Sequence, residues 1–282
     1  MKKKILAAFA DEAGSDLSAQ IRALKDNQIS FLEIRHVNRR NITDFTTEET
    51  KELRKELDNA GISVWSMGSP FGKISITEDF QPHLDRFCHG LELAQILGTH
   101  HLRLFSFFIP ANESPKNYQD TVLERLSRFL EAAKGSGILL CHENEKGIFG
   151  ATAENCEIIH KQLPELRGVF DPANFVQCGE NIVHAWERLE PYVEYLHIKD
   201  ALSDGTVVPP GGGEGQLPWL LERYPGSVLT LEPHLTAFFG RNTLERQAQP
   251  NSEADYHFTS QREAFDVAVA ALNRLLNQEG KN

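Results

Sequence analysis

Residues 138–144 read Ile-Leu-Leu-Cys-His-Glu-Asn, an apolar run that becomes acidic at its end, at Glu143. Three later apolar runs also end in a residue that can bind a metal, the acids Asp171 and Glu232 and the imidazole of His197. The four residues are separated by 28, 26 and 35 positions, each about the length of one strand and one helix. This spacing predicts that four successive parallel strands deliver Glu, Asp, His and Glu to one rim of a sheet or barrel.

The same alternation of a short apolar run and a longer amphipathic segment extends over the whole chain. The expected strands are residues 5–11, 31–37, 63–69, 101–107, 138–144, 167–171, 194–200 and 228–233. The expected helices are residues 17–28, 47–60, 80–97, 117–134, 152–163, 180–189, 217–223 and 261–277. Thr47 is expected to cap the second helix and Gly61 to end it. Eight strands, each followed by a helix, predict a single (β/α)8 TIM barrel, with residues 1–282 as one domain.

An open, doubly wound α/β sheet is the alternative. That fold usually has fewer strands and a glycine-rich phosphate-binding turn after the first of them. Here the first turn, residues 10–16, is acidic and has one glycine, which favours the barrel. The irregular segments 106–116, 201–215 and 235–260 all follow strands, so they are expected at the end of the barrel where active sites form.

Three carboxylates and an imidazole on one rim predict a metal site, because the carboxylates would repel one another without a cation. The predicted ligands are Glu143, Asp171, His197 and Glu232. Oxygen ligands with one imidazole suit Mn²⁺, Mg²⁺ or Co²⁺, and Zn²⁺ is also compatible. The alternative is that each acid is a solvated loop residue beside a strand end, which is hard to reconcile with four residues in phase.

The formal net charge of −11 argues against a nucleic-acid partner, since such proteins usually carry a basic face. The four cysteines are widely spaced, which favours reduced thiols over a disulfide framework. The apolar run 5–10 is too short for a signal peptide, and no stretch is long enough for a membrane span, so a cytoplasmic location is expected. The sequence allows a homo-oligomer and does not decide the oligomeric state.

Taken in order, a set of motifs resembles the sugar isomerase/epimerase family with the xylose-isomerase-like TIM barrel, over nearly the full length. The motifs are His142-Glu143-Asn144-Glu145, Phe170-Asp171-Pro172-Ala173-Asn174, His197-Ile198-Lys199-Asp200, Gly211-Gly212-Gly213-Glu214-Gly215 and Leu231-Glu232-Pro233-His234. The resemblance implies that the four predicted ligands hold the metal and that Glu143 and Glu232 are the catalytic acid/base pair. The implied activity is metal-dependent isomerisation or epimerisation of a ketose or sugar phosphate through an enediolate.

The chain departs from the ketose 3-epimerases of this family at two positions. Asn174 stands where they carry a histidine, and Lys199 stands near the place of their arginine. A metal-dependent dehydratase acting on an inosose-type ketone is therefore the alternative activity. A damaged-DNA endonuclease is disfavoured by the acidic charge and by the missing histidine. A sugar-binding sensor is disfavoured because binding alone needs no acid/base pair.

The remaining predictions concern substrate contacts. Glu33, Arg35, Arg103, Asn174 and Lys199 are predicted to bind the substrate. The three cations among them favour an anionic or acid-bearing sugar. Arg35 and Arg103 can alternatively pair with acids of the barrel mouth. Trp65 and the aromatic run at Phe105, Phe107 and Phe108 are expected either to wall a sugar face or to pack in the barrel.

Overall fold

The computed structural model describes residues 4–239 and 257–279. Eight parallel strands form a closed barrel in the order β1-β12-β9-β8-β7-β6-β5-β2, which confirms the predicted fold. These strands are β1 (Ile5–Ala8), β2 (Phe31–Ile34), β5 (Ser63–Gly68), β6 (His101–Leu104), β7 (Leu139–Glu143), β8 (Arg167–Phe170), β9 (Val193–Ile198) and β12 (Val228–Leu231).

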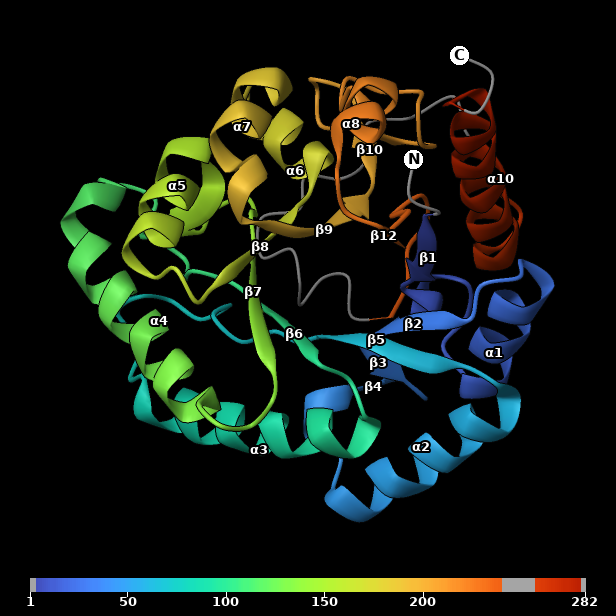
Figure 1. Ribbon diagram of the computed structural model, residues 1–282, viewed down its shortest axis with the longest axis horizontal. Coiled ribbons are helices and arrows are strands. Elements are labelled where there is room, and N and C mark those ends of the chain that lie inside the picture. The colour runs from blue at the N-terminus through green and yellow to red at the C-terminus, as the bar shows by residue number, and fades with distance from the viewer. Residues whose placement is uncertain (1–3, 240–256, 280–282) are drawn as a thin grey trace.

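Helices surround the barrel as an outer ring (Figure 1). They are α1 (Leu17–Asp26), α2 (Thr47–Ala60), α3 (Gln81–Leu97), α4 (Gln119–Ala133), α5 (Ala153–Gln162), α6 (Pro172–Gln177), α7 (Ile182–Leu189), α8 (Leu217–Arg223) and α10 (Gln261–Glu279). The last helix, α10, lies beside the first, α1, and Arg262 forms an ion pair with Asp26 across this junction. Among the described helices, none is long and apolar enough to cross a membrane.

Local sequence signals set the helix ends. The cap of α2 is Thr46 and not Thr47 as predicted, because the Thr46 hydroxyl accepts from the Glu49 amide while the Glu49 carboxylate accepts from the Thr46 amide. The Gly61 backbone has a φ of +73°, a left-handed conformation that ends the helix as expected.

Two predicted strands, 31–37 and 194–200, are each divided in the structure between a shorter barrel strand and a small hairpin. The predicted strand 31–37 ends at Ile34, and its last residues form a small hairpin, β3 (His36–Val37) with β4 (Arg40–Asn41). A second hairpin pairs β10 (Asp200–Ala201) with β11 (Val207–Val208). Helix α6 was not predicted, although Asp171 caps it and Pro172 occupies its first turn, which is a common helix-start signal.

Side chains inside the barrel form two layers. The lower layer, toward the amino-terminal ends of the strands, is a small apolar cluster of Cys141, Val169, Tyr195 and Val228. The predicted metal ligands Glu143, Asp171 and His197 follow the cluster residues of their strands by two positions, and Glu232 follows Val228 by four. Because strand residues two apart point to the same face, the strands that fill the barrel floor also aim Glu143, Asp171, His197 and Glu232 into its mouth.

Candidate metal centre

The four strand-end residues converge in the structure. One ligand atom from each of Glu143, Asp171, His197 and Glu232 lies within 4.8 Å of all the others, and all four side chains are buried. Glu143 ends β7 and His197 lies in β9, while Asp171 and Glu232 directly follow β8 and β12. The geometric expectation from the sequence is therefore met.

His197 lies between the two glutamates. Its Nδ1 atom is 3.0 Å from Glu143 Oε1 and 3.3 Å from Glu232 Oε2. Its ring packs edge-to-face on Phe9, with 5.3 Å between centroids, so the imidazole has an apolar support. Two carboxylates thus flank one nitrogen in a buried mouth.

Each predicted cation contacts one or more of these carboxylates. Arg103 Nε is 3.2 Å from Glu143 Oε2, and Lys199 Nζ is 2.9 Å from Asp171 Oδ2 and 3.4 Å from Glu232 Oε2. The contact between Asp171 Oδ2 and Lys199 is an ion pair without an aligned hydrogen bond. Both cations therefore neutralise groups of the centre.

Arg35 contacts three carboxylates at once. Its guanidinium lies 2.9 Å from Asp11 Oδ2, 3.0 Å from Glu12 Oε1 and 2.9 Å from Glu232 Oε1. This confirms the alternative in which Arg35 pairs with acids of the barrel mouth. Arg103 pairs with an acid as well, although with Glu143, which that alternative did not name.

The described mouth carries more buried negative than positive charge. Its buried carboxylates are Asp11, Glu12, Glu33, Glu143, Asp171 and Glu232. Its permanently charged buried cations are Arg35, Arg103 and Lys199. One divalent ion would compensate two of these three excess negative charges, and a protonated His234, which contacts Glu12 and Glu232, would compensate the third.

The pKa shifts express this excess. Burial raises the pKa of Asp171 to about 6, despite the opposing charge of Lys199. Burial also opposes charge on Glu143, but His197 and Arg103 outweigh it and lower the pKa of Glu143 to about 2. Burial disfavours a charged His197, yet Glu143 and Glu33 raise its pKa well above the ordinary value. The site thus attracts positive charge, whether a proton or a metal ion.

The donor set fits a divalent metal. Three carboxylates and one imidazole offer hard oxygen ligands and a borderline nitrogen, the combination that suits Mn²⁺, Co²⁺, Mg²⁺ or Zn²⁺. All the donors are buried and held by secondary structure, so little ordering is required on binding.

Asn144 and Asn174 hold the ligands in place. The Asn144 side chain donates to the Asp171 carbonyl and accepts from the Asp171 amide, both at 2.9 Å, and so ties the end of β7 to the end of β8. Asn174 donates from its backbone to Asp171 Oδ1 at 3.0 Å, and its Nδ2 lies 3.4 Å from Glu143 Oε1. Asn144 belongs to one of the family-like motifs, but its supporting role was not predicted from the sequence.

Glu33 lies deeper than its predicted substrate role requires. It is fully buried, and its two oxygens contact Tyr195 and His197. Tyr195 was not singled out from the sequence. The alternation on β9 could have shown it, because Tyr195, His197 and Lys199 share one face of that segment.

A family model described as a xylose isomerase-like TIM barrel matches residues 21–238. The chain belongs to this family. No curated protein matches the sequence. Within the family's barrel, the four converging side chains lie at the carboxyl ends of the strands, where (β/α)8 enzymes place their active sites.

Solved structures share the fold of this xylose isomerase-like chain at low identity. The IolI protein with a zinc atom is 15% identical, with a TM-score of 0.74, and the match covers 97% of this chain and 98% of the IolI chain. The probable 3-DHS dehydratase AsbF from Bacillus anthracis is 17% identical, with a TM-score of 0.71, covering 98% and 99%. D-psicose 3-epimerase with D-tagatose from Clostridium cellulolyticum H10 is 15% identical, with a TM-score of 0.73, covering 97% and 98%.

Other residues considered from the sequence fall outside the metal centre of this xylose isomerase-like barrel. Trp65 stacks on His101, the first residue of β6, with 4.1 Å between ring centroids, and packs against the lower cluster, which agrees with the alternative of packing in the barrel. Phe107 packs against Phe129 of α4. Phe105 lies near the centre, with the Arg103 guanidinium 4.5 Å from its ring.

The glycine-rich segment 211–215 wraps around Asp200. The backbone amides of Gly211, Gly213 and Gly215 donate to the Asp200 carboxylate at 2.9–3.0 Å, which fixes this rim loop beside Lys199. Most of the third predicted rim segment, 235–260, lies outside the described residues.

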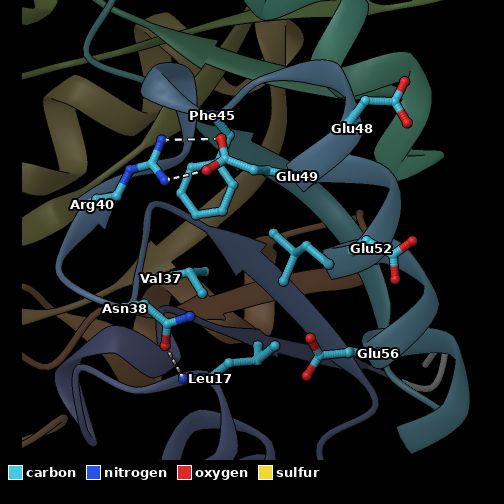
Figure 2. A pocket seen from close by; sticks show the side chains of 10 residues that line it. Leu17, Val37, Asn38, Arg40, Phe45, Glu48, Glu49, Glu52 and Glu56 are labelled. Atoms are coloured by element: carbon cyan, nitrogen blue, oxygen red, sulfur yellow. Dashed lines mark hydrogen bonds and ion pairs between the residues drawn. The ribbon is translucent and has the colours of Figure 1, made fainter.

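A surface groove of about 450 Å³ lies away from the metal centre, between α2 and the β3–β4 hairpin (Figure 2). Its floor includes Leu17, Val37 and Phe45, and Arg40 is paired with Glu49 along one wall. None of the predicted catalytic or substrate residues lines it.

Proposed function

We propose that this protein is a divalent-metal-dependent sugar isomerase or epimerase that moves a proton at carbon through an enediolate, with Glu143 and Glu232 as the acid/base pair. The observation that supports this most strongly is the placement of these two carboxylates on either side of His197 Nδ1, at 3.0 and 3.3 Å. A metal held by Glu143, Asp171, His197 and Glu232 would polarise the substrate carbonyl and stabilise the enediolate.

The two glutamates are prepared for proton transfer by their neighbours. Arg103 contacts Glu143, while Arg35 and Lys199 contact Glu232, so the ionised form of each carboxylate, which acts as the base, is stabilised in a buried site. The ionised glutamate on one face of the substrate removes a proton from carbon and becomes protonated, and its partner, which starts protonated, returns a proton on the other face and becomes ionised.

The charge balance favours an uncharged ketose over a sugar phosphate. Arg35 and Lys199 are each committed to two or more carboxylates, and Arg103 is paired with Glu143. A dianionic phosphate entering this mouth would add to its excess of negative charge. We therefore propose that these cations tune the ligands, and that the substrate is a small sugar without a phosphate.

A dehydratase acting on an inosose-type ketone is the second candidate. Asn174 and Lys199 depart from the residues of ketose 3-epimerases, and a probable dehydratase shares the fold. Its reaction would begin with the same proton abstraction and end in loss of a hydroxyl.

Solvent-deuterium exchange tests the proposal. The Mn²⁺-loaded protein is incubated in D2O with matched free and phosphorylated ketoses and an inosose, and products are followed by NMR. Deuterium on carbon without loss of water supports an isomerase or epimerase, whereas loss of water supports the dehydratase. Glu143→Gln and Glu232→Gln should each abolish exchange, while the control Glu145→Gln, whose carboxylate pairs with Lys73, should retain it. Wild-type exchange in either of the first two variants would contradict the two-carboxylate mechanism.

A further inference from the structure

Glu33 lies behind His197, on the side of the imidazole opposite the metal ligands. The Nε2 atom of His197 is 3.3 Å from Glu33 Oε2, whereas Nδ1 is 3.0 Å from Glu143 Oε1. Both glutamates are buried, and Glu33 is 0% exposed. The ring is therefore held between a carboxylate behind it and the ligand cluster in front of it.

The second oxygen of Glu33 is also committed. The Tyr195 hydroxyl donates to Glu33 Oε1 at 2.8 Å and lies 3.2 Å from Ser66 Oγ. Tyr195 belongs to the apolar lower layer of the barrel, so this chain of hydrogen bonds lies below the mouth. Both Glu33 oxygens therefore have buried partners, and the side chain exposes no surface to the rim.

We propose that Glu33 is a positioning residue that accepts the Nε2–H of His197 and thereby directs the Nδ1 lone pair at the metal. A neutral histidine carries one ring proton, so fixing it on Nε2 leaves Nδ1 free as a ligand. Tyr195 in turn fixes the Glu33 carboxylate. Carboxylates that accept from the far side of a ligand histidine hold its tautomer and orientation, and their loss typically costs about 10–100-fold in metal affinity. This inference rests on the proposed metal centre.

Mn²⁺ titration calorimetry on chelator-treated protein tests the role of Glu33. Glu33→Gln keeps the side-chain shape but can present an amide N–H to Nε2, and it should bind Mn²⁺ about 10–100-fold more weakly than the wild type. Tyr195→Phe is the matched control, because it removes the partner of Oε1 and leaves the Oε2–Nε2 contact. Its affinity should fall less than that of Glu33→Gln.

The outcomes separate this inference from the proposed function. A folded Glu33→Gln variant with wild-type Mn²⁺ affinity, and a raised KM for sugar, would show that Glu33 contacts substrate and would overturn the positioning role. A wild-type protein that binds no Mn²⁺ would instead contradict the metal centre itself.

Nitrogen NMR of the Zn²⁺-loaded wild type provides a measurement that needs no folded Glu33 variant. The His197 signals are assigned by their loss in His197→Gln. The inference predicts a protonated Nε2 and a metal-bound Nδ1. Zinc bound to Nε2, or a proton on Nδ1, would overturn it.

Discussion

Replacing Arg35 with methionine should destabilise the folded protein by about 3–5 kcal/mol, because it leaves buried carboxylates without their counter-charge. The guanidinium lies within 3.0 Å of Asp11, Glu12 and Glu232, and Arg35 is only 1% exposed. Methionine retains most of the side-chain length, and its flexible chain can fill the space over the Phe9 ring, where the guanidinium now lies 4.3 Å from the centroid. For a chain of this size, a loss of that magnitude corresponds to a fall in Tm of about 5–8 °C.

Equilibrium urea unfolding and calorimetry measure this loss against a matched surface variant. Arg40 pairs with Glu49 where both side chains are more than 40% exposed, so solvent screens this pair and Arg40→Met should destabilise the protein far less than Arg35→Met. If Arg35→Met is no more destabilising than Arg40→Met, Arg35 does not serve as the counter-ion of the barrel mouth.

Three further changes test other parts of the structure. Burial lowers the pKa of His142 to about 3 and of His160 to about 4, from the ordinary histidine value of 6.5. Below pH 6.5 the folded state therefore binds fewer protons than the unfolded state, and the free energy of unfolding decreases as the pH falls. Between pH 7.5 and 5 each histidine should cost about 2 kcal/mol of unfolding free energy. His160→Gln should flatten the urea-midpoint profile, and an unchanged slope would show that His160 is not buried in its neutral form. Gly213→Ala should destabilise by about 1–3 kcal/mol, because its Cβ would overlap the Asp200 carboxylate; a Tm equal to that of the wild type would contradict the close approach. Asn144→Ala should weaken Mn²⁺ binding in calorimetry, since two hydrogen bonds that hold the Asp171 backbone are lost, and unchanged affinity would refute that support.

The barrel and the convergence of its ligands could be predicted because both depend on local periodicity. Each of Glu143, Asp171, His197 and Glu232 follows its own apolar run, and parallel strands bring their carboxyl ends to the same rim. No knowledge of long-range side-chain contacts was needed for this step.

The sequence indicated that Arg35 can pair with acids of the barrel mouth, but the full set of partners of the cations and of Glu33 could not be predicted, because many of these partners are distant in the sequence. Arg35 meets Glu232 across 197 positions, and Glu33 meets Tyr195 across 162. The sequence shows that these residues stand near strand ends or inside strands. It does not show that Arg35 forms ion pairs with three carboxylates, or that Glu33 of β2 contacts His197 Nε2.

Mn²⁺ binding to the chelator-treated protein tests the central claim most directly. Calorimetry and electron paramagnetic resonance should show one Mn²⁺ per chain in the wild type. Asp171→Asn and His197→Gln, which each remove one proposed ligand, should weaken that binding by at least about tenfold. A wild type that binds no Mn²⁺, or variants that bind it with unchanged affinity, would contradict the metal centre.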